Sequence, residues 1–261
     1  MQKKQALLLV HGIWSSSSEF GYISKRLVSD ELDIPPTNFK TYGLYGIDEK
    51  TPDFTKWLEE IHKVYNELRK EYEIVHIGGL SLGASLSLAY DICYPNNVNG
   101  CIIALAPILK LDGWGIPFYA GILIPLFCKL NLMQDYLFQE SEPYGLKNKQ
   151  MRAIAKKQFE AGDQSIMGGN NVPIRYLNET YRVSKYVRKN IEKIQSPTLV
   201  IHSIEDETAS IYSARVLAER IKVKMFKKVE LTNSYHIITW DNDRKEVVTQ
   251  IKSFIEDFNR I

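Results

Sequence analysis

Short apolar runs recur along the chain, separated by longer segments in which polar residues dominate. They cover residues 6–10, 39–42, 74–77, 101–106, 198–202 and 226–231. Apolar runs of four to six residues are typical of strands buried on both faces of a sheet. The pattern therefore predicts six buried strands.

Between several of these runs, the apolar residues are spaced as on one face of a helix. The clearest example covers residues 52–72, where apolar residues recur at three- and four-residue steps after the start signal Thr51-Pro52. Further helices are predicted to begin at Ser81 and to cover residues 211–220 and 244–258. Strands that alternate with helices predict an α/β fold, a mostly parallel central sheet flanked by helices.

The alternation is interrupted after the fourth predicted strand. We predict an α/β core formed by residues 1–107 and 197–261, with residues 108–196 inserted as a helical cap over one end of the sheet. Within the cap, residues 113–128 carry no charge, whereas residues 145–195 carry a net charge of +7.

Composition and charge narrow the class of protein. The chain has 261 residues, 44% of them hydrophobic, and a net charge of +2, which is typical of a globular protein and gives no reason to expect a nucleic-acid partner. Three scattered cysteines form neither a disulfide framework nor a zinc motif. Residues 6–10 are too short for a signal-peptide core and residues 113–128 are too short for a bilayer span, so we expect a cytoplasmic location.

The strongest chemical signal is the pentapeptide Gly79-Leu80-Ser81-Leu82-Gly83. It follows one predicted strand and precedes a predicted helix, the context that a nucleophilic serine requires. A sharp turn there exposes the hydroxyl, and the flanking glycines allow neighbouring backbone to approach closely. The pattern predicts Ser81 as a catalytic nucleophile.

A serine nucleophile needs a histidine to accept its proton, and the chain has five. His76 and His202 lie inside predicted strands, His62 lies in the long helix, and His11 is followed by glycine in a predicted turn. His236 follows the last predicted strand, where a loop carries it to the carboxyl edge of the sheet. We therefore predict His236 as the general base.

The acid that orients the histidine is predicted to follow the fifth strand. Asp206 lies there, with Glu205 and Glu207 as competitors and with capping of the next helix as its alternative role. The order Ser81, Asp206, His236 is the order of a serine hydrolase built on an α/β sheet.

An oxyanion hole must bind the negative oxygen of the reaction intermediate. One donor is expected to be the backbone N–H of Leu82, which follows the nucleophile. We assign the second to the backbone N–H of Ile13, in the loop after the first strand.

Residues 7–12, 79–83, 198–206 and 234–241 together resemble the α/β-hydrolase superfamily, most closely its small bacterial carboxylesterases and monoacylglycerol lipases. The resemblance spans nearly the whole chain outside the cap. It implies the same triad and oxyanion hole, and an enzyme that needs neither a cofactor nor a metal.

The predicted function is cleavage of carboxylic esters through an acyl-enzyme intermediate, on a small-molecule or lipid ester. A thioesterase or lysophospholipase with the same triad, or a non-catalytic binding module with this fold, remain alternatives.

Trp14, Trp114, Phe118 and Leu123 are candidate lining residues of the substrate pocket. Three roles are open for the apolar half of the cap: a wall for an acyl chain, transient contact with a membrane surface, or burial of the cap against the core. No obligate protein partner is inferred. The role of residues 15–18, four consecutive serines, stays open.

Overall fold

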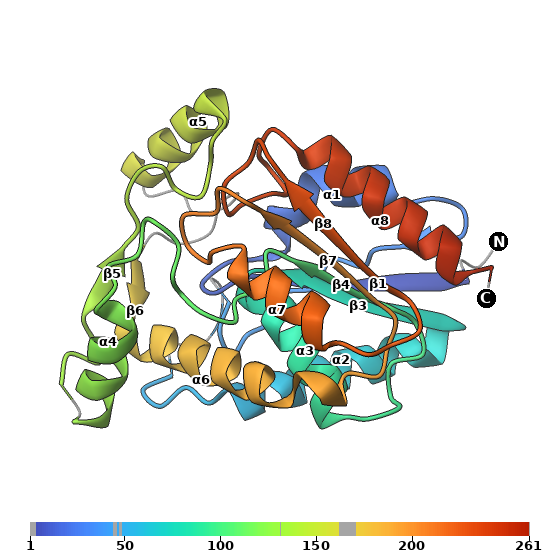
Figure 1. Cartoon of the computed structure of the whole chain (residues 1–261), viewed down its shortest axis with the longest axis horizontal. Coiled ribbons are helices and arrows are strands. Elements are labelled where there is room, and N and C mark those ends of the chain that lie inside the picture. The colour runs from blue at the N-terminus through green and yellow to red at the C-terminus, as the bar shows by residue number, and fades with distance from the viewer. Residues whose placement is uncertain (1–3, 44–45, 47–48, 131, 162–170, 261) are drawn as a thin grey trace.

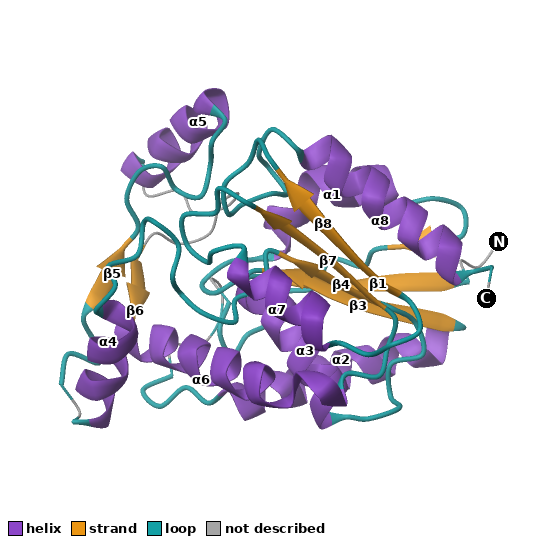
Figure 2. Ribbon diagram, in the orientation of Figure 1, coloured by secondary structure: helices purple, strands orange, loops and turns teal. Residues whose placement is uncertain are grey.

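The computed structural model describes residues 4–43, 46, 49–130, 132–161 and 171–260. A six-stranded sheet lies at its centre, with every neighbouring pair of strands parallel (Figure 2). The predicted sheet of parallel strands is confirmed. In spatial order the strands are β2 (Leu32–Asp33), β1 (Gln5–Val10), β3 (Ile74–Leu80), β4 (Ile102–Leu105), β7 (Thr198–Ser203) and β8 (Phe226–Leu231).

Helices cover both faces of the sheet (Figure 1). One face packs against α1 (Gly21–Leu27) and α8 (Arg244–Phe258). The other packs against α2 (Phe54–Glu71), α3 (Leu82–Cys93), α6 (Ile174–Asn190) and α7 (Tyr212–Arg220). Along β1, Leu7 and Leu9 face the first group whereas Leu8 and Val10 face the second, which explains why the strand is apolar throughout.

The predicted strand at residues 39–42 is wrong. The edge strand is the two-residue β2, and residues 39–42 form a turn. Phe39 and Tyr42 are buried because their rings stack at 5.8 Å and both pack on the ring of His11. The Phe39 N–H donates to His11 Nε2 (3.0 Å) and so makes a side-chain bond in place of a sheet bond.

The segment between β4 and β7 contains, among its described residues, three helices, a short 3-10 helix and a separate pair of strands. It comprises α4 (Ala120–Lys129), β5 (Leu137–Gln139), α5 (Lys149–Glu160), β6 (Asn171–Pro173), α6 and the short 3-10 helix η2 (Ile191–Lys193). In Figure 1, α4 and α5 lie beyond the end of the sheet to which the arrows of β7 and β8 point. In contrast, α6 packs along α3, and its buried residues Val183 and Val187 join the main core.

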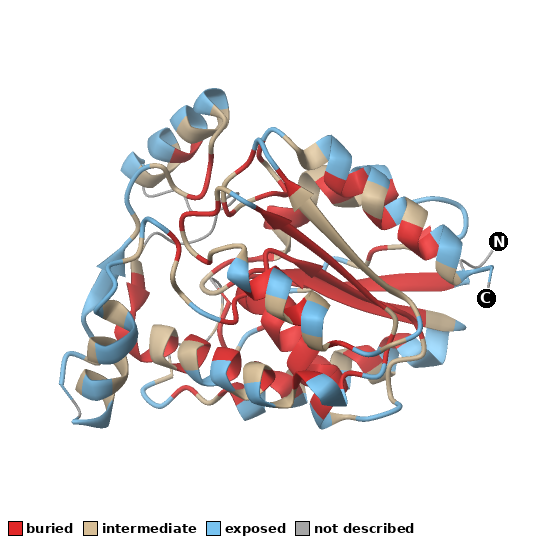
Figure 3. Cartoon of the chain, in the orientation of Figure 1, coloured by how far each residue is buried: buried red, intermediate tan, exposed pale blue. Residues whose placement is uncertain are grey.

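Burial falls off sharply from the sheet to α4 and α5 of this segment, whereas α6 stays partly buried (Figure 3). No residue of α4 is buried, and Phe118 just before it is 94% exposed. Over the described ranges, no helix is both long enough and apolar enough to cross a membrane.

Candidate active site

Ser81 occupies the sharp turn between β3 and α3. Its backbone has φ 60° and ψ −119°, a conformation that a non-glycine residue adopts only under strain. A Cβ on Gly83 or on Gly79 would collide with the carbonyl oxygen of Val10 in β1. The two glycines therefore let β1 lie directly against this turn, and the turn holds Ser81 at the carboxyl edge of the sheet.

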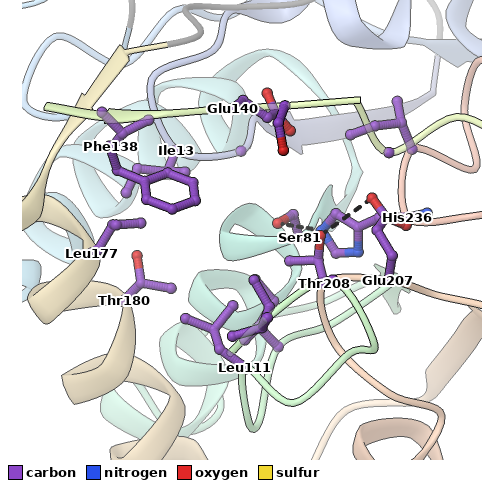
Figure 4. A pocket seen from close by; sticks show the side chains of 18 of the residues that line it. Ile13, Ser81, Leu111, Phe138, Glu140, Leu177, Thr180, Glu207, Thr208 and His236 are labelled. Carbon is purple, nitrogen blue, oxygen red and sulfur yellow. Dashed lines mark hydrogen bonds between the residues drawn. The ribbon is translucent and has the colours of Figure 1, made fainter. Parts of the chain in front are cut away.

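The structure brings Ser81, His236 and Asp206 together (Figure 4). The hydroxyl oxygen of Ser81 lies 2.8 Å from His236 Nε2, and His236 Nδ1 lies 2.7 Å from an oxygen of Asp206. All three residues are at most 8% exposed. An ionised Asp206 can only accept, so Nδ1 carries the proton and Nε2 is free to accept the Ser81 hydroxyl.

Asp206 accepts three hydrogen bonds and lies against a second histidine. One oxygen accepts the N–H groups of Thr208 and Ala209, both at 2.8 Å, as in a helix cap, and the other accepts from His236. That second oxygen also lies 3.1 Å from His202 Nε2, which is hydrogen-bonded to the Ala209 carbonyl at 2.7 Å. Burial alone raises the pKa of Asp206, but the charge of His236 and the contacts with both histidines hold it well below its usual value. The carboxylate is thus charged in the folded state.

The pairing with Asp206 raises the pKa of His236. Burial alone lowers the pKa of the His236 imidazole, whereas the charge of Asp206 and its hydrogen bond raise it above the usual 6.5. Asp206 therefore favours the protonated imidazole, which is the state that forms when a base has taken a proton.

The competing acids serve other contacts. Glu205 forms an ion pair with Lys147 in the inserted segment (2.6 Å). Glu207 accepts the backbone N–H of His236 (3.1 Å) and so fixes the main chain of that residue rather than its ring. His202 was expected to be a core residue only; it is buried in β7, but its contact with Asp206 was missed.

The two residues predicted for the oxyanion hole lie differently with respect to the pocket. Ile13, in the loop after β1, lines it, whereas Leu82 is not among the lining residues described but begins α3 directly after Ser81. Within the described part of the chain, neither N–H has a hydrogen-bond partner. His11 supports this loop, because its Nδ1 lies 2.9 Å from the Gly12 carbonyl.

The loop that carries His236 is tied to the inserted segment by Asp241, which is fully buried. One of its oxygens accepts the N–H groups of Tyr235 and Lys147, both at 2.7 Å, and the other accepts those of Asn148 (2.8 Å) and Asn242 (2.9 Å). One carboxylate therefore fixes the residue before His236 and also the start of the arm that leads to α5.

A cavity of about 250 Å³ opens at Ser81. One part of its wall is apolar, with Phe138 and Leu177 on one side of Ser81 in Figure 4 and Leu111 below it. Near His236 the wall is acidic, with Glu140 and Glu207. The site is therefore an apolar pocket with carboxyl groups beside the histidine.

Of the four candidate pocket residues, only Trp114 lines this cavity. Trp14 turns away and packs edge-on against Tyr176 at 4.9 Å. Phe118 lines a separate hollow near the surface, and Leu123 is half-buried outside the lining, where its neighbour Ile124 takes the wall position. Spacing on an apolar helix does not reveal which face points inward when no face is buried.

Sequence reasoning missed three acids in the pocket, Glu19, Glu140 and Glu142. Glu19, in the 3-10 helix η1 (Ser17–Phe20), is 6% exposed and accepts the Gly12 N–H at 2.8 Å; burial raises its pKa to about 8. Burial also raises the pKa of Glu140.

The run of four serines, residues 15–18, is partly structural, since Ser16 caps η1. The described residues offer no group of three or more side chains suited to holding a metal ion.

The sheet order, the strained serine turn after β3 and the acid and histidine after the last two strands define an α/β-hydrolase. A family model described as serine aminopeptidase, S33, matches residues 1–243. The chain belongs to this family of α/β-hydrolases.

Similar proteins align with this chain over nearly the whole length of both. The chain is 21% identical to a thermostable monoacylglycerol lipase of Bacillus sp. (strain H-257), with 95% of this chain and 89% of that protein covered. It is 22% identical to a carboxylesterase of Bacillus subtilis (strain 168), with 97% of this chain and 92% of that protein covered. Among solved structures, the monoacylglycerol lipase of Paleococcus ferrophilus superposes with a TM-score of 0.80 at 18% identity, over 97% of this chain and 94% of that one.

Proposed function

We propose that this protein is a serine hydrolase that cleaves carboxylic esters through an acyl-enzyme intermediate. The observation that carries the proposal is the continuous chain of hydrogen bonds from Ser81 through His236 to Asp206, at 2.8 and 2.7 Å, at the mouth of an apolar cavity. The similarity to proteins named monoacylglycerol lipase and carboxylesterase supports esters as the substrate class.

In this mechanism His236 accepts the Ser81 proton at Nε2 as Ser81 Oγ bonds to the ester carbonyl carbon. The carbonyl oxygen becomes negative and is bound by the N–H groups of Ile13 and Leu82. His236 then gives its proton to the leaving alcohol, and the ester C–O bond breaks. His236 next accepts a proton from water, whose oxygen bonds to the acyl carbon. The bond from that carbon to Ser81 Oγ then breaks, His236 returns the proton to Ser81, and the acid is released. Asp206 stabilises the imidazolium throughout.

The direct test is the Ser81→Ala variant with p-nitrophenyl hexanoate as the substrate. It removes the nucleophile, so kcat should fall by about 10⁴-fold or more. Ser253→Ala, which makes the same change on α8, is the matched control and should keep wild-type activity. Retained turnover in folded Ser81→Ala would contradict the proposal, and would favour a binding module in which Ser81 has no chemical role.

We propose that the inserted segment, residues 108–196, acts as the cap of this site. Trp114, Ile124 and Phe138 from this segment line the cavity, so it completes the wall that the core leaves open. The apolar lining suits an acyl chain.

We also propose that the exposed apolar face of the cap rests on a lipid surface. Phe118, Ile122 and Trp114 are 94%, 69% and 62% exposed, and α4 ends with Lys129. Exposed apolar residues next to a pocket mark an interaction site, and the +7 charge of residues 145–195 suits an anionic one. Phe118→Asp should weaken sedimentation with anionic vesicles, whereas Val28→Asp, on the core, should not; equal sedimentation of both with wild type would contradict this.

A further inference from the structure

The charge of the pocket wall differs from the charge of the rest of the inserted segment. Among the described residues that line the cavity are four glutamates, Glu19, Glu140, Glu142 and Glu207, and neither Lys nor Arg. Glu142 is paired with Lys156 at 3.0 Å. Within the described residues, the other three carboxyl groups have no ion pair with Lys or Arg.

The basic residues of the inserted segment are used elsewhere. Lys147 pairs with Glu205, and Arg182 pairs with Glu179 at 2.7 Å. Neither cation lines the cavity. Among the described residues, no Lys or Arg of this segment lines the cavity, so a phosphate-bearing leaving group meets none of them there.

The reaction geometry decides which part of a substrate meets the acids. His236 must protonate the leaving oxygen, so the leaving group lies on the His236 side of Ser81. On that side, Glu207 holds the His236 N–H at 3.1 Å. Glu19, Glu140 and Glu207 each lie close enough to His236 to interact with it electrostatically. The acyl chain takes the opposite, apolar side, by Phe138 and Leu177 (Figure 4).

We propose that the enzyme prefers esters whose leaving alcohol carries a positive charge, and disfavours those whose leaving alcohol carries a negative charge. This specificity rests on the proposed function, since it assigns the polar end of the same pocket. Burial raises the pKa of Glu19 to about 8 and that of Glu207 to about 7, so these carboxyl groups are negatively charged and attract a cation above about pH 8. The low polarity of the neighbouring wall strengthens that attraction.

The test uses three hexanoate esters that differ in charge but hardly in shape. Their leaving alcohols are choline, its neutral isostere 3,3-dimethylbutanol, and 2-hydroxyethanesulfonate. At low ionic strength and about pH 9, where the pocket carboxyl groups are ionised, kcat/KM should be about tenfold higher for the choline ester than for the neutral ester, and lowest for the sulfonate. Added salt should reduce the ratio.

Variants assign the effect to the pocket. Glu140→Gln and Glu207→Gln should each lower the choline-to-neutral ratio, whereas Glu219→Gln, the same change on the exposed face of α7, should leave it unchanged. A high wild-type ratio that persists in both pocket variants would overturn the assignment to these carboxyl groups.

Two further outcomes separate this inference from the proposed function. Equal kcat/KM for the three esters, or a preference for the sulfonate, would overturn the charge preference and leave ester hydrolysis standing. Failure to cleave any of them, or p-nitrophenyl hexanoate, would overturn both.

Discussion

Asp241 is expected to be the residue outside the triad on which the site most depends. Its buried carboxylate accepts four backbone N–H groups, two from the His236 loop and two from the start of the arm to α5. In Asp241→Asn one oxygen remains, and the new NH₂ group faces two N–H donors that have lost their acceptor. Each bond to a charged acceptor contributes about 1.5–3 kcal/mol, so the free energy of unfolding should fall by about 3–6 kcal/mol.

Urea unfolding followed by circular dichroism measures this loss, and steady-state kinetics on p-nitrophenyl hexanoate measures its effect on His236. We expect kcat to fall more than KM rises, because the Tyr235 N–H bond fixes the backbone next to the base. Asp257→Asn is the control: this residue is partly exposed on α8 and contacts only Arg260 among the described residues, so stability should change by less than about 0.5 kcal/mol. If Asp241→Asn matched this control in both stability and kcat, the positioning role would be refuted.

Two further predictions follow from the site and the turn. Asp206→Asn should lower kcat/KM by about 10⁴-fold. His236 must be neutral to accept a proton, so activity falls as the pH drops through its pKa. Because Asp206 raises that pKa, the acid side of the pH–activity profile should move to lower pH in the variant. An unmoved profile would contradict the assignment. Gly83→Ala places a Cβ against the Val10 carbonyl, so a thermal melt should show a loss of about 1–3 kcal/mol or a failure to fold, and an unchanged melt would contradict the close approach.

Much of the core could be predicted because its elements have strong local patterns. The helix expected at residues 244–258 is α8, Arg244–Phe258, and the one expected at 52–72 is α2, Phe54–Glu71. Both have one continuous apolar face and a charged opposite face, so local periodicity and tertiary packing agree.

The edge strand could not be predicted in the same way. β2 has only two residues, Leu32–Asp33, and pairs with β1 alone, so no run of apolar residues marks it. Phe39 and Tyr42 form a more strand-like run, but their burial comes from stacking on His11, a contact between segments far apart in sequence.

The chemistry of the site was partly visible in the sequence. Ser81, Asp206 and His236 each follow a strand and were singled out for that reason, and the structure places them in one hydrogen-bonded chain. Glu19 and Glu140 could not be singled out, since an isolated glutamate usually lies at the surface. Their position in the pocket depends on how η1 and the inserted segment pack over the sheet.

The most direct test of the central claim is covalent labelling with a fluorophosphonate, followed by peptide mass spectrometry. Trypsin releases residues 71–110 as one peptide, which contains Ser81 together with Ser85 and Ser87. The hydrogen-bonded chain predicts one adduct per molecule, located on Ser81 and lost in His236→Ala. An adduct on Ser85 or Ser87, or no adduct on folded protein, would contradict the claim that Ser81 is the activated nucleophile.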